Sequence, residues 1–204
     1  MNPINYWNIC NAGGYETIGN DVDYKILIHD SKIILCFQCT KGKLGSVDWK
    51  CNFDFPSAVY KNQKSCMKIH RGYVNAWKSA RDDIMVRMES LIQAEPEYKV
   101  VVIGHSLGGA MALLAAEDIS YSCNFLPTVI TFGAPKICAN SETAHYIDNM
   151  CYITQYAHVN DIVTKVVPTY WHAHKTKLGK FSLPDLFNPT YSHTCYGLLL
   201  QGLV

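Results

Sequence analysis

Along this 204-residue chain, short continuous hydrophobic runs alternate with stretches in which hydrophobic residues have the spacing of a helix. Two apolar runs, 24–29 and 32–37, are separated by Asp30-Ser31 and predict a β-hairpin. Between residues 73 and 93 the apolar positions recur every three or four residues, with charged side chains between them. This spacing predicts an amphipathic helix that covers one face of a sheet.

The second half of the chain repeats a strand-then-helix order. We expect strands over 99–103, 127–132 and 151–156, and helices over 109–118, 141–150 and a short stretch after His193. Segments 1–23, 41–67 and 169–190 are polar or irregular and predict loops or a sheet edge. The alternation predicts an α/β fold with a mixed, mostly parallel sheet flanked by helices. The length fits a single domain over 1–204.

One turn in this pattern carries chemistry. Four β-branched residues lead into Gly104-His105-Ser106-Leu107-Gly108, and an Ala/Leu/Met-rich helix follows at once. A strand, G-x-S-x-G and a helix in this order predict a nucleophile elbow, a sharp turn that lifts the serine hydroxyl off the end of the sheet. Ser106 is therefore a candidate nucleophile, and we expect His105 to point away from it.

Composition and charge exclude several classes of partner. Apolar residues make up 49% and charged residues 17% of the chain, with a net charge of +1, so we expect no nucleic-acid partner. No apolar run approaches 18 residues, so no transmembrane segment is expected. The N-terminal residues lack the pattern of a secretory signal, which predicts a cytoplasmic protein.

Nine cysteines are present, and in a reducing compartment we expect them to be thiols. Cys36 and Cys39 form a C-x-x-C, but no helix signal follows it and no second pair stands at a zinc-site spacing. The interpretation we favour places Cys36 in the core and Cys39 in a loop. No metal or other cofactor is expected.

A serine nucleophile needs a base, and the base needs an orienting acid. In this fold type the acid and the histidine follow the serine in that order. Asp161 comes directly after the predicted strand 151–156 and is the favoured acid. Spacing alone leaves His193 and His174 nearly equal as bases. His172 and His174 would share one face of a strand, but no third metal ligand accompanies them.

Several motifs in order make the chain resemble the class 3 lipase family of α/β hydrolases, typified by fungal triacylglycerol lipases. The matching segments are Phe37-Gln-Cys-Thr40, Asp48-Trp49, His70-Arg-Gly-Tyr73, Gly104-His-Ser-Leu-Gly-Gly-Ala110, Thr131-Phe-Gly-Ala-Pro135, Val159-Asn-Asp161 and His193 with Tyr196. The resemblance implies an α/β-hydrolase fold and a Ser106–His193–Asp161 triad. It also implies an oxyanion hole made by Leu107 and Thr40.

The implied activity is that of a serine carboxylic-ester hydrolase, a lipase or esterase that cleaves lipid-like esters through an acyl-enzyme. The expected partner is a lipid or ester substrate, which the protein could encounter at a lipid–water interface. The oligomeric state stays open. Phospholipase or acyltransferase chemistry would use the same triad, and a non-catalytic lipase-like binding module is a further alternative.

The sequence departs from the family pattern beside the expected oxyanion hole. Gln38-Cys39 stands where the family has Arg-Gly, so Cys39 adds a side chain there. Residues 41–55 would form a lid, in which Trp49, Phe53 and Phe55 are the candidate covering residues. Packing of these aromatic side chains in a loop or core is the equally weighted alternative.

Overall fold

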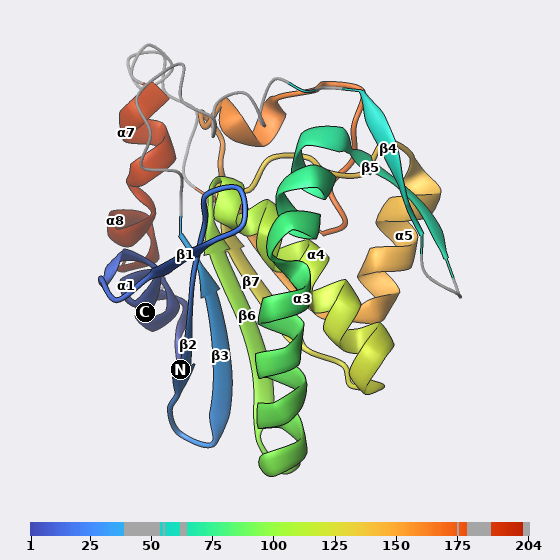
Figure 1. Ribbon diagram of the computed structural model, residues 1–204. Helices are drawn as coiled ribbons and strands as arrows, with labels where there is room; N and C mark the ends of the chain where they lie inside the picture. The colour runs from blue at the N-terminus through green and yellow to red at the C-terminus, as the bar shows by residue number, and fades with distance from the viewer. Residues whose placement is uncertain (39–53, 55, 62–64, 175, 179–188, 202–204) are drawn as a thin grey trace.

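The computed structural model describes residues 1–38, 54, 56–61, 65–174, 176–178 and 189–201. Seven strands form one sheet with helices on both faces (Figure 1). In spatial order they are β1 (Glu16–Ile18), β2 (Val22–Ile28), β3 (Lys32–Phe37), β6 (Lys99–His105), β7 (Thr128–Phe132), β8 (Tyr152–His158) and β9 (Thr176–Leu178). β1, β2 and β3 pair antiparallel, and every later neighbour pairs parallel. The predicted α/β class with a mixed, mostly parallel sheet is confirmed.

The helices divide between the two faces of the sheet. They are α1 (Pro3–Asn11), α3 (Arg71–Ala94), α4 (Leu107–Cys123), α5 (Ser141–Met150), the 3₁₀ turn η1 (Val163–Lys165), α7 (Pro189–Thr194) and α8 (Tyr196–Gln201). α3, α4 and α5 lie on one side of the sheet, whereas α1 and α8 lie on the other (Figure 1). Among the described residues, none of these helices is both long enough and apolar enough to cross a membrane.

The alternation of side chains along β3 separates two hydrophobic cores. Ile33 and Leu35 belong to the core shared with α3 and α4, whereas Ile34 and Cys36 belong to the core shared with α1 and α8. Successive residues of a strand point to opposite faces, so one apolar run serves both layers. Cys36 is fully buried, as predicted.

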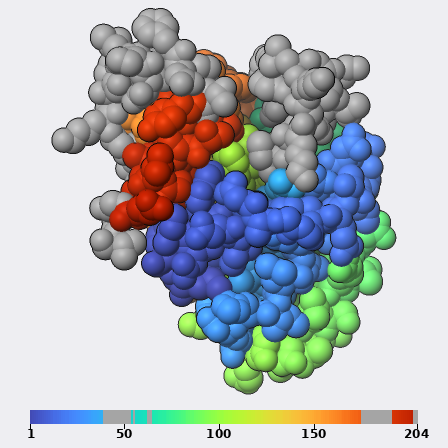
Figure 2. Space-filling view, turned by 90° about the vertical axis from the view of Figure 1, so that its left-hand side faces the viewer, coloured from blue at the N-terminus to red at the C-terminus, as the bar shows by residue number. Residues whose placement is uncertain are grey.

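The ends of the described chain meet on one face. α1 packs against α8, and the N-terminal residues in dark blue lie against the red C-terminal residues in Figure 2. We expected only a polar edge over 1–23. The N-terminal signals of α1 are nevertheless present, because the Asn2 side chain accepts a hydrogen bond from the Asn5 N–H at 3.1 Å and Pro3 begins the helix.

Part of the predicted loop 41–67 is a second, two-stranded sheet. β4 (Ser57–Lys61) pairs antiparallel with β5 (Cys66–His70). The hairpin is fixed to the domain through Tyr60, whose hydroxyl donates to the buried carboxylate of Asp118 on α4. Trp77 and Arg81 on α3 donate to the same carboxylate at 2.6 and 3.0 Å. These contacts join β4 to both helices, which the loop prediction missed.

Candidate active site

Ser106 lies between the end of β6 and the start of α4, in a backbone conformation that L-residues rarely adopt. Its φ is 56° and its ψ is −127°. The flanking glycines allow this turn, because a Cβ on Gly104 would lie 2.1 Å from the Gly108 carbonyl oxygen, and a Cβ on Gly108 would lie 2.5 Å from the Phe37 carbonyl oxygen. This strained strand–turn–helix geometry is that of a nucleophile elbow.

Leu107 is the first residue of α4, directly after Ser106. The N–H groups in the first turn of a helix have no acceptor within that helix, and the positive end of the helix dipole lies there. An oxyanion formed on a substrate carbonyl beside Ser106 would meet these donors. The predicted second donor, Thr40, lies outside the described residues, as do Cys39 and the lid candidates Trp49, Phe53 and Phe55.

Asp161 follows β8 and is fully buried, with both of its carboxylate oxygens hydrogen-bonded. Oδ2 lies 2.9 Å from Nδ1 of His193 and accepts the Tyr196 hydroxyl at 2.7 Å. Oδ1 accepts the backbone N–H of Val163 at 2.9 Å. A carboxylate accepts rather than donates, so Nδ1 of His193 carries the proton and Nε2 presents its lone pair.

His193 lies within α7, not in the loop that we expected before a final helix. Its ring packs against that of His105 in a tilted arrangement with the centroids 4.7 Å apart, and its carbonyl oxygen lies 2.9 Å from Nε2 of His105. His105, which we expected to point away from Ser106, thus contacts the candidate base His193. Adjacency to Ser106 says nothing about which distant segment packs on the other side of the turn.

Gly133 lies between the serine turn and the Asp161–His193 pair, which we call the acid–base pair. The N–H of Ser106 donates to the carbonyl oxygen of Phe132 at 2.9 Å, and Gly133 follows with a φ of 59°. A Cβ at Gly133 would lie 2.8 Å from Oδ2 of Asp161 and 3.0 Å from Nδ1 of His193. The ends of β6, β7 and β8 thus bring Ser106, Asp161 and His193 to the same edge of the sheet.

Tyr196 supports this arrangement from beneath. Its hydroxyl accepts the backbone N–H of His158 at 3.0 Å while it donates to Asp161. Burial raises the pKa of Tyr196, and the neighbouring Asp161 carboxylate raises it further, so the hydroxyl stays protonated as a donor. The Trp7 ring of α1 packs against Tyr196 and His105, with centroid distances of 5.6 and 5.1 Å.

The alternative histidines lie elsewhere. Nε2 of His172 lies 2.9 Å from the carbonyl oxygen of Thr164, and His174 is exposed. Among the described residues, no group of three or more His, Cys, Asp or Glu side chains could hold a metal ion. Asp118, another acidic residue after Ser106, is engaged by Tyr60, Trp77 and Arg81 instead of a histidine.

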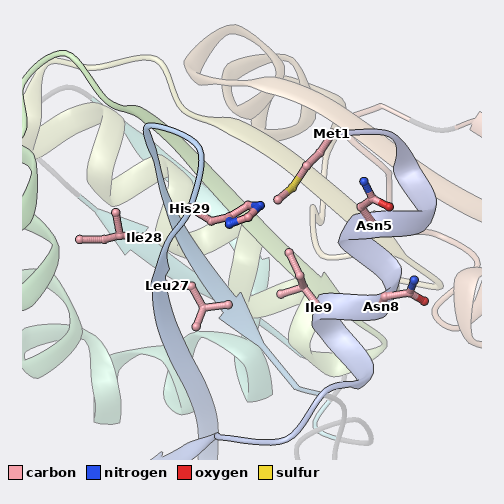
Figure 3. A pocket seen from close by; sticks show the side chains of 7 residues that line it. All are labelled: Met1, Asn5, Asn8, Ile9, Leu27, Ile28 and His29. Atoms are coloured by element: carbon pink, nitrogen blue, oxygen red, sulfur yellow. The ribbon is translucent and has the colours of Figure 1, made fainter.

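A surface hollow of about 420 Å³ opens far from these residues. Figure 3 shows it between α1 and the β2–β3 hairpin, and its lining residues are Met1, Asn5, Asn8, Ile9, Leu27, Ile28 and His29. None of them belongs to the serine turn or the acid–base pair. The hollow is therefore separate from the candidate site.

Comparison with known proteins identifies a family. Residues 34–171 match the model of the family described as lipase (class 3). The Saccharomyces cerevisiae protein LIH1, whose lipase designation is provisional, is 32% identical over 148 residues, which span 72% of this chain and 33% of LIH1. The secreted mono- and diacylglycerol lipase A of Penicillium cyclopium is 29% identical over 169 residues, 76% of this chain and 53% of the lipase.

A solved structure gives the fold. The triacylglyceride lipase of Rhizomucor miehei superimposes with a TM-score of 0.69 over 82% of this chain and 66% of its own, at 21% identity. The chain thus spans between a third and about half of the two curated relatives and has the same fold as the Rhizomucor enzyme.

Proposed function

Because the chain belongs to the class 3 lipase family, we propose that it hydrolyses carboxylic esters of lipids through a covalent acyl-enzyme on Ser106. The observation that carries the proposal is the His193–Asp161 pair, in which a buried and doubly oriented carboxylate fixes the imidazole tautomer beside the serine turn. A protein that only bound lipid would have no need of an oriented base next to a strained serine.

The proposed reaction follows from this arrangement. Nε2 of His193 removes the proton of Ser106 as Oγ attacks the ester carbonyl carbon. The resulting oxyanion lies at the N-terminus of α4, where the Leu107 N–H donates to it, with Thr40 as the predicted second donor. His193 then protonates the leaving alcohol. Asp161 stabilises the imidazolium that forms between these two proton transfers.

Water completes the cycle. It attacks the acyl-serine carbonyl while His193 takes one of its protons. His193 then returns that proton to Oγ of Ser106 as the acyl bond breaks, so the free acid leaves and the serine hydroxyl is regenerated. The name of the Penicillium relative supports acylglycerols as the substrates to test first. A panel of monoacylglycerol, triacylglycerol and phosphatidylcholine would rank these head groups.

The triad is tested with a fluorophosphonate probe, which forms a stable adduct with an activated serine. We expect mass spectrometry to locate the adduct on Ser106, and we expect His193→Ala to abolish labelling and to lower kcat for a p-nitrophenyl ester by at least about 10³-fold. His174→Ala is the matched control and should retain both. Absence of labelling in folded protein would favour the binding module, and loss of hydrolysis in His174→Ala alone would make His174 the base.

The lid over 41–55 stays a prediction. If Trp49, Phe53 and Phe55 cover the site in water, the specific activity toward a short ester should rise when the ester passes from monomer to aggregate. Unchanged specific activity across that concentration would contradict a lid.

A further inference from the structure

Two cysteines from separate elements face each other behind the sheet. Cys10 lies on α1 and Cys36 on β3, and their sulfur atoms are 3.7 Å apart. Both side chains are buried. Cys36 was half of the C-x-x-C in the sequence, but the thiol that it meets in the described structure is Cys10.

Polar groups surround this pair within the hydrophobic core. The Tyr15 hydroxyl lies 3.0 Å from Sγ of Cys36 and 2.8 Å from the carbonyl oxygen of Cys10. The Lys25 ammonium is 4.3 Å from the centroid of the Tyr15 ring, and its side chain is only 4% exposed. A buried cation and a hydroxyl beside two thiols make an environment that favours one thiolate.

The two thiols differ in acidity. Burial opposes ionisation of Cys36, but its hydrogen bonds with Cys10 and Tyr15 and the charge of Lys25 outweigh it, so the pKa of Cys36 lies below its ordinary value. The pKa of Cys10 is raised, first by its hydrogen bond with Cys36 and then by burial. Cys36 is thus the nucleophile of the pair, and Cys10 is the resolving thiol.

We propose that Cys10 and Cys36 are a dithiol site that hydroperoxides oxidise to a disulfide, which fastens α1 to β3. The Cys36 thiolate attacks the terminal oxygen of the hydroperoxide and the O–O bond breaks. The Cys36 sulfur keeps that oxygen as a sulfenic acid, and the other oxygen leaves as an alcohol or water after taking up a proton. The Cys10 sulfur then displaces the hydroxyl group, the S–S bond forms, and water is released. An S–S bond is about 2.05 Å long, so each sulfur has to move by less than about 1 Å.

Access to the buried pair comes from α1 itself. This helix has nine residues, and a short terminal helix opens locally far more often than the whole domain unfolds. Oxidation would end this opening. Since Trp7 lies on the same helix and packs on His105 and Tyr196, the disulfide would also hold the layer beneath the acid–base pair in place.

The test uses the full chain treated with hydrogen peroxide and then with an alkylating reagent. We expect peptide mapping to find a Cys10–Cys36 cross-link that dithiothreitol reverses, and we expect amide exchange in residues 3–11 to slow at least tenfold on oxidation. Cys10→Ser should form no such cross-link and show no slowing, with Cys10→Ala as a second variant if serine impairs folding. Cys66→Ser, which removes an exposed thiol, should behave as the wild type.

Three outcomes would overturn the site: a Cys36–Cys39 cross-link, sulfinic acid on Cys36 without a cross-link, or oxidation confined to Cys66. None of these readouts uses ester hydrolysis, so the result is independent of the proposed function.

Discussion

The carboxylate of Asp161 depends on two donors besides His193. Tyr196 and His193 donate to one of its oxygens and the Val163 backbone to the other. Each bond restricts rotation of the carboxylate and so restricts the direction of the imidazole. Loss of one donor should weaken the orientation of His193 without removing any reacting group.

Tyr196→Phe removes the hydroxyl that donates to Asp161 and accepts from the His158 N–H. We expect kcat to fall about tenfold with KM unchanged, since a net hydrogen bond to a charged group contributes about 1.5 kcal/mol. Steady-state hydrolysis of a short p-nitrophenyl ester measures both constants. Tyr152→Phe, at an exposed position, is the control, and a change in KM alone would argue against a positioning role for Tyr196.

Gly133→Ala places a methyl group against both Asp161 and His193 in a left-handed backbone conformation. We expect about 2 kcal/mol of lost stability from the backbone strain and at least about 100-fold lower kcat from displacement of the pair. Urea unfolding and ester hydrolysis report the two effects. Gly13→Ala, where a Cβ would meet nothing within 4 Å, should change neither, and a fully active Gly133→Ala would refute the close approach.

The residues of the site differed in how well the sequence alone predicted them. Ser106 was predictable because its elbow is local, and Asp161 because a strand ends just before it. His193 lies 32 residues after Asp161 and needed the family resemblance, since His174 had equal standing by spacing. The roles of Gly133 and His105 were missed because they depend on contacts with α7, which no local pattern encodes.

At the scale of elements, the Asp118 carboxylate joins the β4–β5 hairpin to α3 and α4. It lies in the interior and accepts donors from Tyr60, Trp77 and Arg81. The adjacent carboxylate raises the pKa of the Arg81 guanidinium, although partial burial acts against it. A network of this kind is costly to break, because the remaining donors lose their acceptor inside the protein.

Asp118→Ala leaves the Tyr60, Trp77 and Arg81 donors without their shared acceptor. We expect the free energy of unfolding to fall by about 3 kcal/mol, as for loss of one partner of a buried ion pair. Chemical denaturation measures the loss. Asp148→Ala, on the exposed side of α5, should be nearly neutral, and equal stabilities for the two variants would show that the network is not structural.

Helices and strands were predicted best where their hydrophobic positions recur with a regular spacing. The helix expected over 141–150 has those bounds, and the helix expected over 73–93 spans Arg71–Ala94. The hairpin formed by β4 and β5 was missed because its strands alternate buried and exposed residues within a polar segment, so few apolar positions mark them. α1 is short and of mixed polarity, although Asn2 and Pro3 are recognisable start signals.

For the molecule as a whole, Lys25 holds the α1 layer on the sheet. Its ammonium donates to the carbonyl oxygens of Ile9, Ala12 and Gly13 at 2.8, 2.7 and 3.0 Å. These carbonyls are at the C-terminal end of α1, where a cation also interacts favourably with the helix dipole. One buried charge therefore connects β2 to the helix that covers the second core.

Lys25→Met keeps the length of the side chain but removes all three donors. We expect the free energy of unfolding to fall by about 2 kcal/mol and amide exchange in residues 3–11 to accelerate. Hydrogen-exchange mass spectrometry locates the effect. Lys99→Met at an exposed position is the control, and acceleration spread evenly over the chain would contradict a local role.

For the global arrangement, the sequence predicted only the fold class. Alternating strands and helices indicated a layered α/β fold, but they did not indicate that α1 and α8 share a face or that β9 closes the sheet beside β8. Those features depend on which segments meet after long separations in sequence. The single domain over 1–204 remains a prediction.

The pairing of α1 with α8 has a consequence for synthesis on the ribosome. Residues 3–11 emerge before residues 196–201, and at about 5–20 residues per second the interval between them is about 10–40 s. During that time Tyr6 and Trp7 lack the helix that covers them in the finished molecule. The His193–Asp161 pair cannot assemble before α7 leaves the exit tunnel, so the proposed ester hydrolysis can begin only after α7 has been synthesised.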